Sequence, residues 1–241
     1  MADIDFLEAI RRESALFVDA AASVPLETPV PTCPGWKVED LVSHLASVQS
    51  WAAAMVEVRA AERLDRKTLA SPPAGPAVLA WMREATARLL RALEQAGPSD
   101  PMWFWTGHGT VADWRRRQAQ EAAVHRWDAQ DAAGPCRPLD AALAADGVDE
   151  LLTLHLARGP ERFVGEPGTL HLRATDAAAE WLLTVGPVGL RVEHRGGEAD
   201  VTARATASDL DLFLWGRLSV FALRVDGSMG LLERFQRLTA L

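Results

Sequence analysis

The chain has 241 residues, of which 49% are hydrophobic and 24% are charged, and its formal net charge is −8. This length allows one large domain or two domains of ordinary size. The negative net charge repels a polyanion, so nucleic acid is not an expected partner. No run of about 18 apolar residues exists to span a membrane. The three arginines at 115–117 are expected to lie on a solvated helix face, with one side chain turned inward.

The first residues, MADIDFLEAIRR, carry acids where a signal peptide needs bases, so a cytoplasmic protein is expected. Cys33 and Cys136 are too few for a disulfide framework and too far apart for a zinc knuckle, so both are expected to be reduced thiols. Arginine supplies 23 of the 25 basic residues and tyrosine is absent, which is typical of GC-rich genomes such as those of actinobacteria.

Helical periodicity predicts four helices in the first half of the chain, over residues 4–24, 37–63, 77–95 and 111–133. Segments rich in Pro and Gly separate them at 25–36, 71–76 and 97–98. In the second of these helices His44 lies within an apolar stripe made by Leu41, Val48, Trp51 and Met55. Long helices with short connections favour a four-helix bundle, with His44 facing its core.

The segment 101–109 is rich in aromatic residues and is predicted to be a loop that either lines a pocket or caps the bundle. A fifth helix is predicted over 139–158, followed by alternating patterns typical of strands at 169–174, 181–185, 190–194 and 199–205. Helices over 207–215 and 229–238 flank a short strand at 222–225. The sequence therefore predicts a two-domain α+β protein, with a helical bundle over 1–157 and a small α+β domain with an antiparallel sheet over 158–241.

Glu121 and His125 are four residues apart in a predicted helix, so their side chains project from one face. Such a pair is common on solvated helices, and a histidine such as His44 is often only a core residue. Together the three offer two imidazoles and one carboxylate, a ligand set that leaves coordination positions open as in catalytic zinc sites; nickel, iron or manganese also fit it. Asp128, three residues after His125, is expected either to accept a hydrogen bond from a ligand imidazole or water, or to pair with a surface arginine.

Two segments, TCPGWKVEDLVSHLA from residue 32 and QEAAVHRWD from residue 120, resemble the mycothiol-dependent maleylpyruvate isomerase family. In the second half, DAAAEW from residue 176 and ATASDLDLFLWGR from residue 205 are similar to that family's second-domain segments. The resemblance implies a DinB-like bundle followed by a sterol-carrier-protein-like domain, and a metal triad of His44, Glu121 and His125. Gln120 is a departure, because relatives often carry histidine there.

The chemistry that the resemblance implies begins with mycothiol. A divalent metal lowers the pKa of this thiol, and the thiolate adds to a small electrophile. Addition of the thiolate followed by its elimination isomerises a cis double bond to trans. If instead the adduct is released, or another group leaves, the thiol is transferred to the electrophile. The resemblance also gives Arg217 a role in clamping a carboxylate of the substrate or cofactor, and Trp36 a role as a pocket wall beside the cofactor.

Two other functions remain open from the residues alone. One is a non-catalytic binder of an apolar ligand whose bundle holds a structural metal, and the other is a metal-dependent hydrolase that needs no thiol. The expected partners are a small-molecule substrate and a low-molecular-weight thiol, and the chain is expected to be a monomer or a homodimer.

Overall fold

The computed structural model describes residues 4–155, 167–187 and 189–239. The chain divides into two compact units, one formed by Ile4–Arg137 and the other beginning at Pro138. The boundary predicted between residues 157 and 158 lies outside the described residues. The predicted fifth helix, α5 (Ala141–Glu150), belongs to the second unit, because it packs against α6 (Ala207–Leu214) of that unit.

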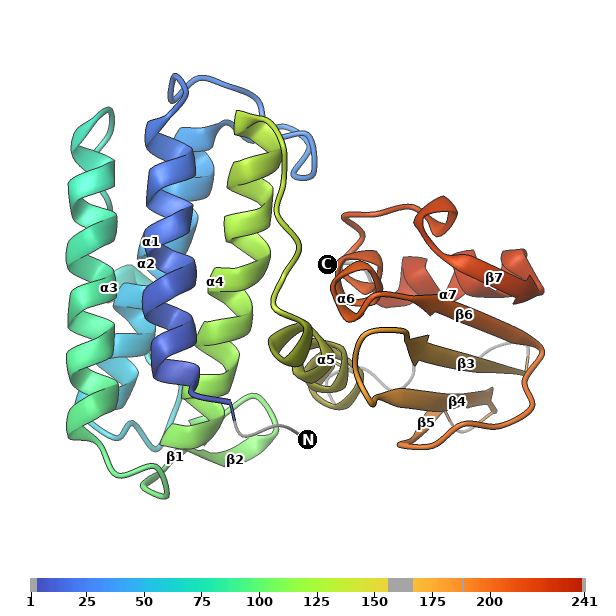
Figure 1. Cartoon of the computed structure of the whole chain (residues 1–241). Coiled ribbons are helices and arrows are strands. Elements are labelled where there is room, and N and C mark those ends of the chain that lie inside the picture. The colour runs from blue at the N-terminus through green and yellow to red at the C-terminus, as the bar shows by residue number, and fades with distance from the viewer. Residues whose placement is uncertain (1–3, 156–166, 188, 240–241) are drawn as a thin grey trace. The chain divides into compact units, whose positions relative to one another are not determined.

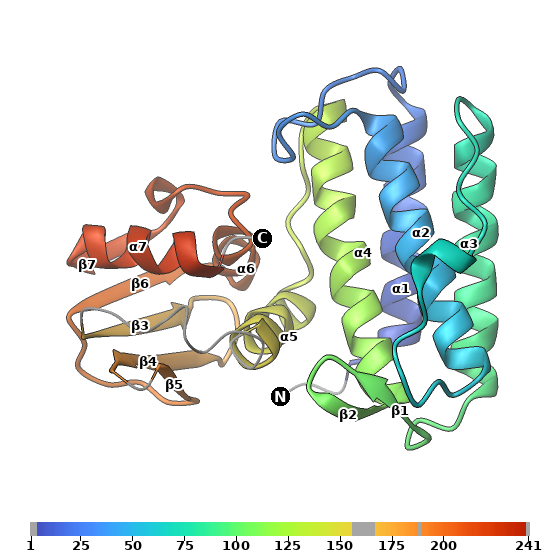
Figure 2. The same ribbon diagram turned by 180° about the vertical axis from the view of Figure 1, so that it is seen from behind.

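The N-terminal unit is a bundle of α1 (Phe6–Ala22), α2 (Val38–Glu57), α3 (Ala77–Gln95) and α4 (Val111–Ala133). The helices lie side by side in Figures 1 and 2, and α1 and α2 each contact both α3 and α4. The limits of α3 and α4 are those that the sequence predicts. One part of the bundle core consists of residues contributed by all four helices and by the connector between α1 and α2: Phe17, Val18, Ala21, Val30, Val38, Leu41, Val42, Leu45, Ala46, Val78, Met82, Ala85 and Ala129.

Helix α2 ends at Glu57, before its predicted limit at residue 63. The chain turns there because Arg59 adopts a left-handed φ of 48° and its Nε donates to Asp100 Oδ2 at 2.7 Å. The carbonyl of Ala60 then accepts from the backbone N–H of Trp103 at 2.7 Å. Contacts with a distant segment therefore override the local helical pattern, and a loop with the short 3-10 helix η1 (Arg66–Thr68) follows.

The aromatic segment predicted as a loop is instead an antiparallel hairpin of β1 (Pro101–Phe104) and β2 (Gly107–Thr110). Gly107 takes φ of 99° in its turn, which a side chain would disfavour. Trp103 lies with its ring 6.2 Å from that of Trp51 in α2, and Trp51 in turn lies 5.2 Å from Trp114 in α4. The hairpin thus extends the core of the bundle with aromatic rings.

The C-terminal unit places a five-stranded sheet beside helices (Figure 1). Helix α5 continues as a π-helical segment, Leu151–His155. The strands are β3 (Gly168–Ala174), β4 (Glu180–Gly186), β5 (Gly189–Glu193), β6 (Val201–Ala205) and β7 (Arg224–Gly227), in the order β5-β4-β3-β6-β7. Helix α6 packs on β3 and β6, while α7 (Met229–Thr239) packs on β6 and on η4 (Val220–Ala222).

The sheet is antiparallel as predicted, except that β3 and β6 pair in parallel. β4 and β5 fill one side of β3, and the segment 194–200 crosses back so that β6 runs along the other edge of β3 in the same direction. Among the helices that the structure describes, none combines the length and apolar character needed to cross a membrane.

Candidate metal centre

The structure brings together the three side chains that the sequence nominates as metal ligands. His44 comes from α2, and Glu121 and His125 lie one helical turn apart on α4. Glu121 Oε1 lies 3.3 Å from His44 Nε2 and 3.5 Å from His125 Nε2, and one potential ligand atom from each residue lies within 4.8 Å of the others. Two imidazoles and one carboxylate therefore converge across the interface between two helices.

The two carboxylate–imidazole distances, 3.3 Å and 3.5 Å, fit a metal ion. Ligands bonded at about 2.0–2.2 Å in a tetrahedral arrangement lie about 3.3–3.6 Å from one another. The side chains of His44, Glu121 and His125 are 33%, 17% and 10% exposed, so the group is accessible from the His44 side. Three protein ligands with one accessible side leave room for a further ligand, which is the arrangement of catalytic zinc sites.

Asp128 lies behind the triad and contacts it through His125. Its side chain is fully buried, and its Oδ2 accepts from His125 Nδ1 at 2.9 Å. Its other oxygen, Oδ1, accepts from the hydroxyl of Thr32 at 2.6 Å. The ring of His125 is thereby fixed with Nε2 directed toward Glu121. Asp128 thus orients the ring of His125, as expected of a residue that accepts from a ligand imidazole, and its assignment as a catalytic residue remains a prediction.

Arg117 lies beside the triad on α4. Its guanidinium is buried, and Nη2 donates to Glu121 Oε2 at 3.0 Å. Burial raises the pKa of Glu121, but hydrogen bonds from His125 and His44 and the charge of Arg117 outweigh it and hold that pKa well below its ordinary value. Arg117 thus keeps a candidate ligand ionised. Of the other two consecutive arginines, Arg115 is also directed into the bundle, where its Nη2 donates to the carbonyls of Leu93 and Ala96, so the prediction of a single inward side chain is wrong.

The pKa of His125 is shifted in the opposite direction. Burial lowers it, but hydrogen bonds to Asp128 and Glu121 and the charges of these two carboxylates raise it to about 9. In the absence of a metal the imidazole is therefore protonated at neutral pH. A cation that binds to His125 Nε2 has to displace this proton.

With this geometry established, comparisons with known proteins identify the family. Residues 7–130 match the family model described as the mycothiol maleylpyruvate isomerase N-terminal domain, and residues 142–234 match the model of the MDMPI C-terminal domain. The chain belongs to the mycothiol maleylpyruvate isomerase family. The search of curated protein sequences finds no significant match.

The fold of this family is also found among solved structures. The crystal structure of the mycothiol-dependent maleylpyruvate isomerase is 14% identical, with a TM-score of 0.63, and a histidine-to-alanine mutant of that enzyme is 13% identical, with a TM-score of 0.65. Each alignment covers 92% of this chain and 92% of the other. At this identity the similarity shows that the two-domain fold is shared.

In this member of the family, the segment that carries Trp36 is built as a tight turn. Gly35 adopts a left-handed φ of 86°, and the backbone N–H of Trp36 donates to the carbonyl of Cys33 at 2.9 Å. The indole ring then lies 5.0 Å from the ring of His44. Trp36, predicted to contact the cofactor, therefore stands directly beside the accessible ligand of the triad.

Arg217, the other predicted cofactor and substrate contact, lies in the C-terminal unit just after α6. Its Nη1 donates to the carbonyl of Trp215 at 2.8 Å, and its guanidinium carbon lies 6.0 Å from the Trp215 ring. Its role at the triad remains a prediction.

The two cysteines have different surroundings, and neither is in a disulfide. Cys33 places its Sγ 3.7 Å from Asp128 Oδ2, next to the positioning carboxylate. Burial, together with the charge and hydrogen bond of Asp131, raises the pKa of the Cys136 thiol to about 11. Cys136 is therefore a poor nucleophile at neutral pH.

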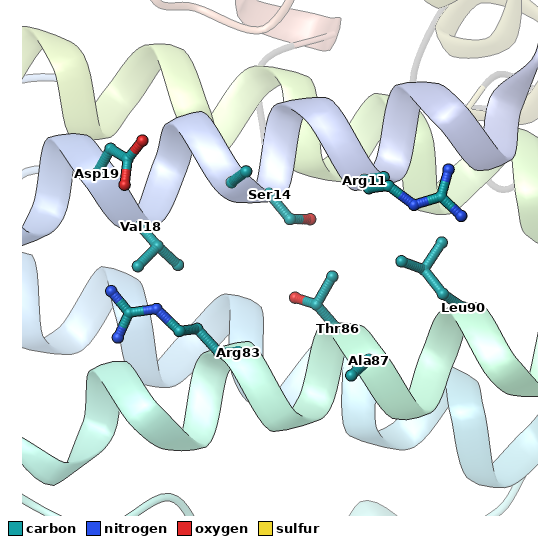
Figure 3. A pocket seen from close by; sticks show the side chains of 9 residues that line it. Arg11, Ser14, Val18, Asp19, Arg83, Thr86, Ala87 and Leu90 are labelled. Carbon is teal, nitrogen blue, oxygen red and sulfur yellow. The ribbon is translucent and has the colours of Figure 1, made fainter.

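A groove of about 280 Å³ lies between α1 and α3, away from the residues of the triad. Figure 3 shows Ser14 and Thr86 facing each other across it from the two helices. Both hydroxyls are hydrogen-bonded to the buried amide of Gln49, at 3.0 Å and 2.6 Å. These two hydroxyls therefore already have partners within the bundle.

Proposed function

We propose that this protein is a metal-dependent, mycothiol-using enzyme that adds an activated thiolate to a small electrophile, as a cis–trans isomerisation or a thiol transfer. The observation that supports it most directly is the convergence of His44, Glu121 and His125, with ligand atoms within 4.8 Å, in a chain of the mycothiol maleylpyruvate isomerase family. Zinc is the proposed metal, because two imidazoles and one carboxylate suit it.

In this proposal His44 and His125 bind the cation through Nε2, and Glu121 binds it through Oε1. A divalent cation in this site supplies a Lewis acid that lowers the pKa of a thiol, so that the thiolate is available at neutral pH. Asp128 holds the ring of His125 through Nδ1, at 2.9 Å, so the ligand nitrogen does not rotate away. Arg117 keeps Glu121 in its ionised, ligating form.

Two further residues are proposed to contact the reactants. Trp36 forms an aromatic wall 5.0 Å from His44, where it restricts the approach of the thiol and excludes water from one side of the centre. Arg217 is proposed to bind a carboxylate of the substrate or cofactor, since a guanidinium matches a carboxylate with two parallel hydrogen bonds.

The test measures metal content and turnover in the same preparations. Protein purified with zinc present is expected to hold one equivalent, and His44→Ala is expected to lose it, whereas His108→Ala, a change on the exposed hairpin, is expected to retain it. Turnover is then screened with maleylpyruvate and other thiol-reactive electrophiles, with and without mycothiol. A wild-type protein without metal contradicts the proposal, and turnover that needs no thiol indicates a hydrolase instead.

A further inference from the structure

Arg66 lies on the loop that follows α2, with its guanidinium over an indole ring. Its Cζ atom is 4.4 Å from the centroid of the Trp51 ring, within the range of a cation–π contact. The Nε1–H of Trp51 donates to the carbonyl of Leu64 at 3.0 Å, which holds the loop against α2 just before Arg66. Within the part of the chain that the structure describes, no carboxylate forms an ion pair with Arg66.

This arginine lies along the same helix interface as the metal centre. Trp51 follows His44 by seven residues on α2, and Trp114 precedes Glu121 by seven residues on α4, so each pair shares a helix face. The rings of Trp51 and Trp114 are 5.2 Å apart. Seven residues of helix rise about 10 Å, so the tryptophans form a layer about that far from the triad.

The electrostatics connect the two layers. Arg117 lies between Trp114 and Glu121 in the sequence of α4, and it pairs with the carboxylate of Glu121 at 3.0 Å. Partial burial of the guanidinium lowers the pKa of Arg66, and the negative charge of Glu121 raises it. The charge of this candidate ligand therefore acts on Arg66. Glu121 is also paired with Arg117, and Arg66 forms no ion pair among the described residues, so its N–H donors are available to an anionic ligand.

We infer that Arg66 binds a carboxylate of one of the reactants at the metal centre. The guanidinium carbon lies over the Trp51 ring while the Arg66 side chain is exposed, so its N–H donors are accessible to a carboxylate, which a guanidinium binds through two hydrogen bonds. The inference rests on the proposed function, since it names a chemical feature of a reactant bound beside the same metal. It makes Arg66 a specificity-determining residue in the N-terminal unit.

The test uses the cobalt-substituted protein, in which a thiolate bound to Co²⁺ gives a charge-transfer absorption band. Mercapto acids of increasing chain length are titrated beside the uncharged mercapto alcohols of the same length. The wild type is expected to bind the acid of best-fitting length roughly tenfold more tightly than its alcohol, a difference of about 1.4 kcal/mol. Arg66→Gln is expected to remove this preference.

Arg63→Gln is the matched control, because the guanidinium of Arg63 lies farther from the same ring, at 6.0 Å. It is expected to keep the preference for the acid. Equal affinities for acid and alcohol in the wild type, or a preference that survives in Arg66→Gln, overturn the inference while the proposed function stands. Absence of a thiolate band with every thiol overturns the proposed function itself.

A second titration tests the carboxylate of the electrophile, because mycothiol itself has no carboxylate. Maleate, a cis dicarboxylate, is added to the cobalt protein that already holds mycothiol. Weaker maleate binding in Arg66→Gln than in Arg63→Gln, with mycothiol affinity unchanged in both, is the expected result. An unchanged maleate affinity in Arg66→Gln, or a loss confined to mycothiol affinity, overturns the inference.

Discussion

His125 and Asp128 are joined by a hydrogen bond between the imidazole Nδ1 and the carboxylate Oδ2, 2.9 Å apart, on consecutive turns of α4. Because the carboxylate accepts, the proton lies on Nδ1, and Nε2 is the nitrogen left for a metal. The carboxylate is fully buried, so this orientation is held within the bundle and not by solvent. The orientation of one candidate ligand is therefore set by a residue outside the group of candidate ligands.

Asp128→Asn keeps the size of the side chain but replaces its charge with an amide. We expect metal affinity to fall roughly 10- to 100-fold, the usual cost of losing the partner of a ligating imidazole. Competition with a chromophoric chelator measures the affinity. Asp131→Asn, on the same helix, is the control, and an affinity for Asp128→Asn equal to that of the wild type would contradict the positioning role.

Thr32 extends the same chain of contacts from α4 to the connector before α2. Its hydroxyl donates to Asp128 Oδ1 at 2.6 Å. Thr32→Val removes the donor with little change in shape, so we expect weaker metal binding in the direction of Asp128→Asn but smaller. Thr32→Ser keeps a hydroxyl and is expected to restore most of the affinity. If valine and serine behave alike in the chelator competition, the hydroxyl has no positioning role.

The grouping of the three candidate ligands was predictable from the sequence because Glu121 and His125 obey helical spacing and His44 interrupts an apolar stripe. The contacts of Thr32 and Arg66 were not predictable from the sequence. Thr32 bonds to a residue 96 positions away, and Arg66 lies in a loop whose path depends on where α2 ends. For Thr32 the sequence held a signal, since it opens the segment resembling the family, but nothing local indicated its partner.

The same dependence on long-range contacts explains where the observed fold differs from the predicted one. The limits of α3 and α4 were predictable because Gly-Pro pairs follow both helices, at 97–98 and 134–135, and this local signal agrees with the tertiary packing. The end of α2 depends on Arg59, whose partner Asp100 is 41 residues away, and the hairpin after α3 depends on rings from two other helices. Long-range contacts of this kind leave no periodic signal in one sequence.

The raised pKa of His125 predicts how the metal-free protein responds to alkali. Its value of about 9 in the folded chain exceeds the ordinary 6.5, so the folded state binds the proton more tightly than the unfolded state does. This contribution to the free energy of unfolding is fully present below about pH 6.5 and is lost as the pH rises toward 9. Urea titrations between pH 6.5 and 9.5 should show the loss, and His125→Gln should flatten the profile.

The same shift predicts proton release when metal binds. At pH 7 the metal-free His125 is protonated, so zinc binding should release close to one proton from this residue, and the release should shrink as the pH passes 9. Calorimetry in buffers of different ionisation enthalpy counts the protons. A count that does not change between pH 7 and pH 9.5 would show that His125 is already neutral in the metal-free protein.

A buried ion pair joins α1 to α4 apart from the metal centre. Arg126 Nε donates to Glu13 Oε2 at 2.7 Å, and both side chains are 3% exposed. Glu13→Ala leaves the guanidinium buried without its carboxylate, so we expect unfolding free energy to fall by roughly 3–5 kcal/mol. The exposed pair of Arg88 and Glu57, also 2.7 Å apart, is the control, and Glu57→Ala should cost less than about 1 kcal/mol. Chemical denaturation of both variants measures the difference, and similar losses in the two would show that burial does not set the strength of the α1–α4 pair.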